Sequence, residues 1–401
     1  MRIVHIEDYF FPSAGYQINL LSRLQVLQGH DVTIVASELD KIPNNYTVFF
    51  GKAAQKDKEY TLRTGVKIIR VPIIGFYSGR SIYYPGIFKV VDSLKPDVLF
   101  VHGEDTLIGM QFIWRASKLK YPLVLDCHMI EMASMNRFRN LFRVFYQKMI
   151  APIIVKNKIP LIRVVDVDYV EKCLGIPLSH TTLLSLGTDT DLFKPDELVS
   201  RDFRAQHGIG EKDFVVLYAG KLDRFKNGLF LADAIKEEFH LAADRKVVFI
   251  IIGNTEGEYG RQVEKKLLES RNRIVRFPTQ DYFDLSAYYP AADLAVFPMH
   301  CSLSFFDVQS CGLPVLFEKN EINNERSQYN NGFTFIPGDI NDFRLKLKDC
   351  AEIPKEEFES LQKDSRKYIL DNFNFVHIAD KITKLLENEV FRYKQINPKK
   401  K

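Results

Sequence analysis

The chain has 401 residues, of which 46% are hydrophobic and 26% are charged, and its formal net charge is +4 at pH 7. This length is too great for one ordinary core, so two domains of roughly 150–200 residues each are expected. The composition is that of a globular protein, and the net charge is too small for this length to indicate a dedicated nucleic-acid binder.

The N-terminus and the cysteines favour a cytoplasmic protein. The sequence opens with MRIVHI, without the basic and then apolar segment of a secretory signal. No stretch reaches the roughly 18–20 apolar residues that a transmembrane helix needs. The five cysteines form no CxxC pair and are odd in number, which suits a reducing compartment and argues against a disulfide framework or a zinc site.

Short apolar runs in the first half of the chain predict buried parallel strands. They are RIVHI at 2–6, DVTIVAS at 31–37, KIIRVP at 67–72, DVLFVH at 97–102 and PLVLDCH at 122–128. Between the first two, Ile18, Leu21, Leu24 and Leu27 repeat at helical spacing, and Gly29 is a suitable helix stop. Strand, helix and strand in this order predict a doubly wound α/β sheet.

The same pattern restarts after a segment rich in Gly, Pro and acidic residues at 186–202. Five further strands are predicted from DFVVLYAG at 213–220, KVVFIIIG at 246–253, RIVRFP at 273–278, ADLAVFP at 292–298 and GLPVLFE at 312–318. We therefore expect two Rossmann-like domains, at 1–190 and 191–372, facing each other across a cleft. The last segment, 373–401, is expected to be a helix with a basic tail that could cross back to the N-terminal domain.

Two loops that follow predicted strands contain residues suited to an anionic ligand. In FFPSAGYQ, Ala14 and Gly15 precede a helix, and backbone N–H groups there could hold a phosphate, although an ordinary β–α turn is an equal interpretation. In YAGKLDRFKN, Lys221 and Lys226 follow Gly220. Two cations at this place could clamp a diphosphate and neutralise a leaving group, whereas solvated surface lysines are the plainer alternative.

A third loop, within PMHCSLSFFDVQSCGLPV at 298–315, combines one carboxylate with several hydroxyl groups. Asp307 precedes a turn of small residues, and His300, Ser302 and Ser304 lie between it and the end of a predicted strand. A compact Ser-rich turn before a helix is itself a geometry that can hold an anion.

These pieces, in this order, resemble the GT-B glycosyltransferases, specifically the large retaining family 4, the glycosyl transferases group 1. FFPSAGYQINLLSRLQVLQGHDVTIVAS is similar to the family's opening loop and helix, SLGTDTDLFKP to its hinge, and YAGKLDRFKN to its diphosphate clamp, with Lys221 in place of the usual arginine. YYPAADLAVFP and SCGLPV are similar to its C-terminal motifs. The motifs are individually weak and jointly strong, and they cover nearly the whole chain.

The resemblance implies a nucleotide-sugar site in the C-terminal half and an acceptor site against the N-terminal half. Gly220, Lys221 and Lys226 would bind the donor diphosphate, and backbone near Phe277 and Pro278 would contact the base. In the N-terminal half, Ala14 and Gly15 would form the glycine-rich substrate loop.

The family often places a histidine near the donor sugar, on a strand that here ends in His128. A satisfied interior histidine is an equal interpretation. Asp126 could hold His128, His102 has a weaker case as a site residue, and His5 is expected to be structural.

The resemblance breaks at one of two glutamates that the family carries eight residues apart. Asp307 matches the second, which binds the nucleotide ribose, but Met299 stands where the first would grip the donor sugar. We expect a rebuilt donor loop in which Ser302 and Ser304 contact phosphate or sugar, with loss of function as the competing interpretation.

The activity implied by the resemblance is retaining transfer of a hexose-type sugar from a nucleotide sugar to a glycan acceptor. Catalysis would rest on positioning and on charge stabilisation by Lys221 and Lys226, together with His128, so no metal and no cofactor are expected. Two alternatives remain open: a non-catalytic or repurposed GT-B nucleotide-binding protein, and a GT-B nucleotide-sugar epimerase.

The stretch MNRFRNLFRVFYQKMIAPIIVKNK at 135–158 bears on the acceptor. Aromatic and aliphatic residues repeat on one helical face, and no acid falls among its basic residues. Such a helix suits an anionic membrane surface, although its apolar face could equally meet the sheet. With the resemblance, this implies a lipid-linked or polysaccharide-precursor acceptor and a peripheral position on the inner face of a membrane.

Overall fold

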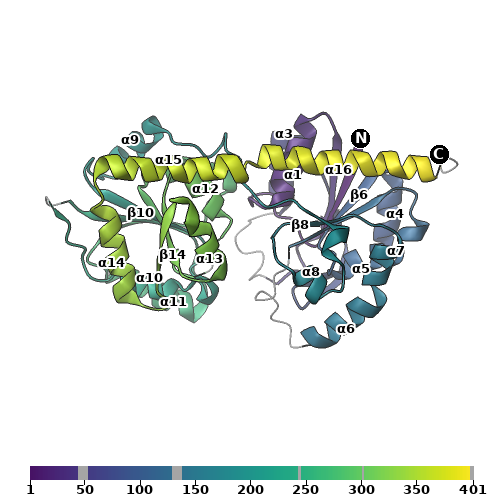
Figure 1. The fold of residues 1–401 in the computed structure, drawn as a ribbon, viewed down its shortest axis with the longest axis horizontal. Coiled ribbons are helices and arrows are strands. Elements are labelled where there is room, and N and C mark those ends of the chain that lie inside the picture. Colours follow the sequence, from purple (N-terminus) through teal and green to yellow (C-terminus); the bar gives the residue numbers. More distant parts are fainter. Residues whose placement is uncertain (44–52, 129–137, 243–244, 300–301, 398–401) are drawn as a thin grey trace. The chain divides into compact units, whose positions relative to one another are not determined.

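The computed structural model describes residues 1–43, 53–128, 138–242, 245–299 and 302–397. The chain divides into two compact units: unit 1 is Met1–Leu186 with Phe375–Lys401, and unit 2 is Gly187–Asn374. Each unit contains a parallel β-sheet with helices packed around it (Figure 1). Among the described residues, no helix has both the length and the apolar character needed to cross a membrane.

The sheet of unit 1 has seven strands in the order β3-β2-β1-β6-β7-β8-β9. The pairing is parallel throughout, with Ile3 of β1 opposite Val32 of β2 and Val98 of β6. Every residue of β6 and β7 is buried, as expected for strands covered on both faces. The strands are β1 (Arg2–Glu7), β2 (Asp31–Ser37), β3 (Lys67–Val71), β6 (Val98–His102), β7 (Leu123–Cys127), β8 (Leu161–Arg163) and β9 (Thr181–Leu183).

A separate antiparallel hairpin follows β3 and was not predicted from the sequence. Its strands are β4 (Ile73–Tyr77) and β5 (Arg80–Tyr83), and Ser78 and Gly79 both have positive φ in the turn between them. The hydroxyl of Tyr83 donates to the carbonyl oxygens of Glu7 and Asp8 at 2.8 and 2.7 Å, so the hairpin is fastened to the carboxyl end of β1.

The helices of unit 1 include the last helix of the chain, α16 (Phe375–Ile396). It packs against α1 and β6, and Gln28 donates to Asp380 Oδ1 at 2.5 Å. Further along α16, the Tyr393 hydroxyl donates to the Leu119 carbonyl at 2.9 Å. The other helices are α1 (Gln17–Leu27), α3 (Ala53–Thr64), α4 (Gly86–Ser93), α5 (Leu107–Trp114), α6 (Arg139–Met149), α7 (Ala151–Lys156) and α8 (Tyr169–Lys172).

The sheet of unit 2 has six parallel strands in the order β12-β11-β10-β13-β14-β15. All residues of β10 and β11 are buried. The strands are β10 (Phe214–Ala219), β11 (Val247–Ile252), β12 (Arg273–Phe277), β13 (Leu294–Phe297), β14 (Val315–Glu318) and β15 (Gly332–Phe335).

The helices of unit 2 begin earlier than the sequence indicated. The segment 186–202, which the sequence indicated as the connection between the two domains, already contains the start of α9 at Glu197, because the Asp196 side chain accepts the Val199 N–H at 3.0 Å and caps the helix. The helices are α9 (Glu197–Gln206), α10 (Gly228–Ala234), α11 (Gly257–Leu268), α12 (Ser304–Ser310), α13 (Glu321–Arg326), α14 (Ile340–Ala351) and α15 (Lys355–Asn372).

Both sheets have the strand order of a doubly wound fold, which confirms the predicted fold class. The order reverses between β1 and β6 in unit 1 and between β10 and β13 in unit 2. In open α/β sheets, ligands bind beyond the carboxyl ends of the strands at such a reversal. We therefore expect site residues at these two positions.

Candidate functional site

In unit 2, the strand order reverses between β10 and β13. The loop after β10 carries Gly220, Lys221 and Lys226. Lys226 ends a short 3₁₀ helix, where its N–H donates to Asp223 Oδ1 at 3.0 Å. The backbone is crowded behind this loop, because a Cβ added to Gly253 would lie 1.8 Å from the Gly220 carbonyl oxygen. The loop is thus fixed in position by its capping bond and by close backbone packing.

The two predicted serines meet this same loop. Ser304 Oγ donates to the Ala219 carbonyl at 3.1 Å, and the Ser302 and Ser304 hydroxyls are hydrogen-bonded to each other. A Cβ on Gly220 would lie 3.9 Å from Ser302 Oγ. The structure therefore brings Ser302, Ser304 and Gly220 together at the carboxyl end of β10. His300 lies outside the described residues.

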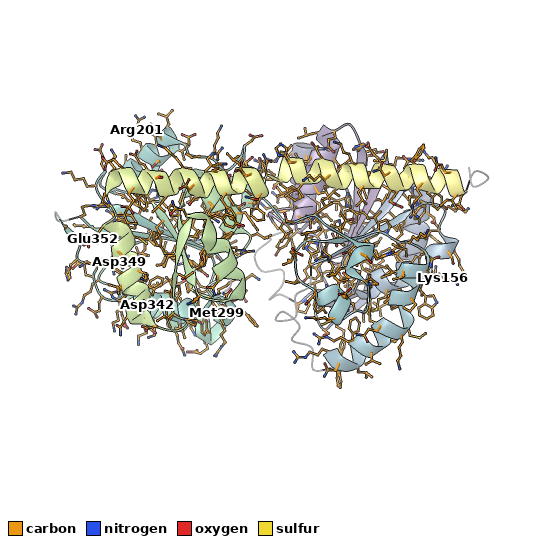
Figure 2. All side chains as sticks on the ribbon, viewed as in Figure 1. Lys156, Arg201, Met299, Asp342, Asp349 and Glu352 are labelled. Atoms are coloured by element: carbon orange, nitrogen blue, oxygen red, sulfur yellow. The ribbon has the colours of Figure 1, made fainter. Side chains whose placement is uncertain are left out.

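Met299 occupies the position of the absent glutamate, directly after β13 and Pro298 in unit 2 (Figure 2). Its thioether can pack against a sugar but cannot accept the strong hydrogen bonds that a carboxylate accepts from hydroxyl groups. In the described part of this loop, side-chain hydrogen bonding to a ligand would have to come from Ser302 and Ser304.

Asp307 is committed to contacts inside unit 2. Its side chain lies on α12 and is 4% exposed, and Thr188 Oγ1 donates to its Oδ1 at 2.5 Å. Burial raises the pKa of Asp307 to about 7, while the hydrogen bond from Thr188 lowers it. In this arrangement the carboxylate ties α12 to the segment that begins unit 2, and ribose binding by Asp307 stays a prediction.

We expect Asp307→Asn to change the pH dependence of stability. Because the folded-state pKa of Asp307 lies above its ordinary value of 3.8, the folded state loses stability as pH rises from about 4 to about 7. Asparagine stays neutral and can still accept the Thr188 hydroxyl. Urea titrations give the free energy of unfolding of the variant minus that of wild type. This difference should therefore be more favourable to the variant at pH 8 than at pH 5, by about 1–4 kcal/mol.

A matched control for this prediction is Asp202→Asn, since Asp202 is 75% exposed on α9. Its difference from wild type should be the same at both pH values. If the free energy of unfolding of Asp307→Asn differed from that of wild type by the same amount at pH 5 and pH 8, Asp307 would be ionised in the folded protein at pH 5.

The predicted base-binding residues lie at the end of β12. Phe277 packs edge-on against Tyr288, with ring centroids 4.9 Å apart, and also contacts His207. Pro278 is exposed, and Thr279 donates its N–H to Asn254 Oδ1 at 2.9 Å. Strand β12 lies two strands from β10 in the sheet. Because these strands are parallel, the loops that follow β10 and β12 lie on the same edge of the unit 2 sheet.

In unit 1, Ala14 and Gly15 lie in the loop between β1 and α1. The Ala14 N–H donates to the Phe11 carbonyl at 3.1 Å, which closes a turn, and α1 then begins at Gln17 without a side-chain cap. Uncapped N–H groups at this helix start remain compatible with the predicted substrate loop.

His128 ends a chain of buried hydrogen bonds that joins three strands. Gln25 Oε1 is 2.8 Å from His5 Nε2, His5 Nδ1 is 2.9 Å from His102 Nε2, and His102 Nδ1 is 2.6 Å from Asp126 Oδ2. The same Asp126 oxygen is 3.1 Å from His128 Nε2. His5 and His102 are thus part of one network with His128, which the sequence did not reveal.

This network sets the charge of His128. Burial opposes ionisation of Asp126, but His102 and His128, together with the Gly103 N–H at 2.8 Å, hold the pKa of Asp126 below its ordinary range. Burial lowers the pKa of His128, yet Asp126, with Glu7 and Glu104, raises it to about 9. The His128 side chain is 38% exposed, so a positively charged imidazolium is available at the edge of unit 1.

His102, Asp126 and His128 are also close enough to hold a cation, since one ligand atom from each lies within 4.8 Å of the others. The hydrogen bonds account for this spacing, because both imidazoles direct a ring nitrogen at Asp126 Oδ2. A metal there would have to displace two N–H donors from a carboxylate that is already satisfied.

The sequence reasoning missed the acidic residues at the carboxyl ends of β1 and β6. Asp8 follows β1, and Glu104 and Asp105 follow β6 on the other side of the strand-order reversal. These residues could have been found from the sequence, because the predicted strands at 2–6 and 97–102 are each followed within three residues by carboxylates. Arg80 could not be added to them because the hairpin that carries it was not predicted.

Comparison with known proteins agrees with this geometry. Residues 213–352 match the family Glycosyl transferases group 1. The chain is 29% identical over 254 residues to D-inositol 3-phosphate glycosyltransferase of Corynebacterium aurimucosum, a match that covers 58% of each chain. It is 27% identical over 231 residues to UDP-Gal:alpha-D-GlcNAc-diphosphoundecaprenol alpha-1,3-galactosyltransferase of Escherichia coli, covering 55% of this chain and 57% of that one. It thus spans little more than half of either relative.

A solved structure extends the likeness to both units. The crystal structure of Anabaena HepE in complex with UDP and glucose matches with a TM-score of 0.70 at 18% identity, covering 97% of this chain and 100% of that chain. The fold is therefore GT-B. The match to Glycosyl transferases group 1 covers residues 213–352, which lie within unit 2.

Proposed function

We propose that the protein is a retaining glycosyltransferase that moves a hexose-type sugar from a nucleotide sugar to a glycan acceptor. The observation that carries the proposal is the meeting of two loops at the reversal of strand order in unit 2. The loop after β10 carries Gly220, Lys221 and Lys226, and the segment after β13 brings Ser302 and Ser304 against it. The proposal is further supported by the match of residues 213–352 to the Glycosyl transferases group 1.

In the proposed reaction, Lys221 and Lys226 bind the donor diphosphate and stabilise the charge that develops as the bond from the sugar to the diphosphate breaks. The acceptor hydroxyl attacks the anomeric carbon from the leaving-group side and gives its proton to a phosphate oxygen, which leaves with the nucleoside diphosphate. His128 would act in unit 1 as a hydrogen-bond donor and positive charge. With its Nε2 directed at Asp126, its Nδ1 is the atom left for substrate.

We propose that neither a metal nor a cofactor takes part. Two lysines supply the positive charge that a divalent cation would otherwise provide at a diphosphate. In unit 1, the only described histidine–carboxylate group with metal-like spacing is held together by its own hydrogen bonds. Activity that is unchanged by EDTA would agree with this expectation.

The acceptor is proposed to be a lipid-linked or polysaccharide-precursor glycan. The name of the Escherichia coli relative gives a uridine-linked galactose donor and a diphosphoundecaprenol-linked sugar acceptor, and the Anabaena structure contains UDP and glucose. UDP-galactose and UDP-glucose are therefore the first donors to test.

The test is a transfer assay with full-length protein, these donors and a panel of lipid-linked and free glycans. Release of UDP that depends on the acceptor, and a product whose anomeric configuration matches the donor by NMR, would support the proposal. Nucleotide binding without turnover on any acceptor would favour the non-catalytic alternative, and interconversion of the donor sugar would favour an epimerase.

We also propose that unit 1 contacts an anionic membrane through α6. Along this helix only Tyr146 is buried, and its hydroxyl donates to the Glu104 carbonyl at 3.3 Å. Leu141 is 70% exposed, and the other exposed apolar residues here are Phe138, Val144, Phe145 and Met149. The aromatic stripe predicted to meet the sheet in the alternative interpretation is thus largely open to solvent. Residues 135–137 lie outside the described part.

Positive charge accompanies this apolar surface. Arg139 and Lys148 are exposed on α6, and Lys156 ends the neighbouring helix α7 (Figure 2). Exposed apolar side chains with basic residues and no acid suit the boundary between anionic headgroups and acyl chains.

We expect full-length protein to sediment with vesicles that contain phosphatidylglycerol and not with vesicles of phosphatidylcholine alone. Lys148→Glu should weaken binding several-fold, since each basic residue near the surface contributes about 1 kcal/mol. Leu141→Ser should weaken it at every salt concentration, because it removes apolar area. Binding of wild type to both vesicle types alike would contradict an electrostatic contribution.

A further inference from the structure

A row of polar side chains crosses one face of the unit 1 sheet and is met by α1. Strands β1, β6 and β7 are neighbours, and their register sets His5 opposite Phe100 and His102 opposite Asp126. Paired residues of a parallel sheet point to the same face, as do residues two positions apart in one strand. The side chains of His5, His102 and Asp126 therefore share a face, and Gln25 reaches them from α1.

Burial makes each member of this row depend on the next. Gln25, His5 and Asp126 are fully buried, and His102 is 4% exposed. A buried polar group destabilises the folded protein unless it has a hydrogen-bond partner. In this row the hydrogen bonds run from Gln25 through His5 and His102 to Asp126, so both ring nitrogens of each buried histidine are engaged.

These contacts give His102 a single orientation. Its Nε2 is 2.9 Å from His5 Nδ1, and its Nδ1 is 2.6 Å from Asp126 Oδ2. The ring also stacks on that of His5, with centroids 5.2 Å apart, and packs against Phe100 at 4.4 Å. Because a carboxylate only accepts hydrogen bonds, His102 Nδ1 carries a proton and donates to Asp126. Rotation of the His102 ring would break a contact at each of its nitrogens.

Asp126 is held by His102 and in turn directs His128. Its Oδ1 accepts the Gly103 N–H at 2.8 Å and its Oδ2 accepts from His102, so the plane of the carboxylate is fixed. The same Oδ2 lies 3.1 Å from Nε2 of His128, which follows the end of β7 and is 38% exposed. Without His102, the carboxylate would keep the Gly103 contact but could turn about its last side-chain bond.

We infer that His102 is a positioning residue for His128. His102 fixes the Asp126 carboxylate, this carboxylate directs the His128 ring, and His5 and Gln25 hold His102 from the other side. This inference rests on the proposed function, in which His128 acts on the substrate through Nδ1. Two buried histidines and a buried glutamine thus occupy a face that apolar side chains would otherwise fill.

The experiment compares two substitutions at position 102 in the full-length protein. His102→Phe keeps an aromatic ring beside Phe100 but removes both nitrogens. His102→Asn removes the ring but keeps a donor toward Asp126, because the amide nitrogen of asparagine is as many bonds from Cβ as Nδ1 of histidine. Both variants lose the contact with His5, so a merely structural role would make their effects alike.

The first readout is the rate of transfer from UDP-galactose or UDP-glucose, whichever is the active donor. We expect kcat to fall ten-fold or more in His102→Phe and less than three-fold in His102→Asn, since small displacements of a catalytic group can slow a reaction by up to about 10²-fold. KM for the donor should change less than kcat in both variants, because His102 itself touches no substrate.

The second readout is the motion of the His128 ring, which needs no substrate. NMR relaxation of protein labelled in its histidine rings should show an ordered His128 ring in wild type and in His102→Asn. The same ring should be mobile on the picosecond-to-nanosecond timescale in His102→Phe. Circular dichroism melting establishes that each variant is folded, and His102→Leu takes the place of His102→Phe if the latter does not fold.

His180→Phe and Asp97→Asn are controls within unit 1. His180 Nε2 contacts the Ile159 carbonyl at 3.0 Å, so its replacement also removes a histidine hydrogen bond. Asp97 precedes β6 at its other end, where it accepts the Arg2 N–H. Both variants should match wild type in kcat and in the order of the His128 ring.

Two results would overturn the inference. One is a His128 ring that is as ordered in the folded His102→Phe protein as in wild type. The other is an equal loss of kcat in His102→Phe and His102→Asn. Absence of transfer by wild type to every acceptor would count against the proposed function alone, because the motion of the His128 ring would still decide the role of His102.

Discussion

Replacing Lys226 with alanine is expected to lower the rate of sugar transfer by about 10²- to 10³-fold, the usual effect of removing one group that stabilises developing charge. Lys226 ends a 3₁₀ helix that Asp223 caps, and Asn227 follows in a left-handed conformation with φ of 54°. This backbone conformation fixes the position from which the Lys226 side chain extends. The ammonium group should therefore act on the leaving diphosphate more than on the ground state, so kcat should fall more than KM rises.

Arg224→Ala is the matched control for Lys226→Ala. Arg224 lies in the same 3₁₀ helix, but its guanidinium group stacks over the Tyr259 ring at 5.1 Å. Its removal should change activity less than about three-fold, in keeping with a modest cation–π contribution at a partly exposed site. An equal loss in both variants would indicate damage to the loop in place of a specific role for Lys226.

The second large effect is expected from Asp126→Asn. The substitution keeps the size of the side chain but removes the charge that raises the pKa of His128 to about 9. We expect the pKa of His128 to fall below about 7, so that at pH 7.5 the imidazole is neutral and transfer is slower by about 10- to 100-fold. Activity of the variant should recover in part as pH is lowered toward 6.

NMR titration of the histidine side chains tests this prediction apart from activity. In wild type, the charged form of His128 should persist up to about pH 9, and the stability that its ion pair contributes should be lost as pH rises through that value. Asp97→Asn should leave the titration unchanged. A His128 pKa that is the same in wild type and in Asp126→Asn would contradict the role given to Asp126.

The central strands of both sheets could be predicted because each is a buried apolar run with little ambiguity. Strands β8 and β9 have only three residues each, so their apolar signal is too short to be recognised. The hairpin β4–β5 was missed for another reason. Its Ser78-Gly79 turn is a recognisable signal, but the pair lies outside the repeating strand and helix pattern.

Candidate site residues could be named from the sequence where they lie close together in it, as with Gly220, Lys221 and Lys226, whose binding role stays a prediction. Contacts between distant segments were not predicted. His5 was expected to be structural and is fully buried, but its contact with His102 at 2.9 Å, set by the parallel pairing of β1 with β6, was not predicted. Asp307 was predicted to bind the nucleotide ribose, and its hydrogen bond from Thr188, far away in the sequence, was not predicted. Such contacts follow from sheet order and not from local pattern.

The most direct test of the donor site is calorimetric titration of the full-length protein with UDP, GDP, ADP and their common sugar conjugates, in wild type and in Lys226→Ala. We predict selective binding of one nucleotide, a rise in melting temperature with its concentration, and at least ten-fold weaker binding in Lys226→Ala. If none of these nucleotides or sugar conjugates binds the folded wild-type protein, unit 2 is not a nucleotide-sugar site and the proposed function is wrong.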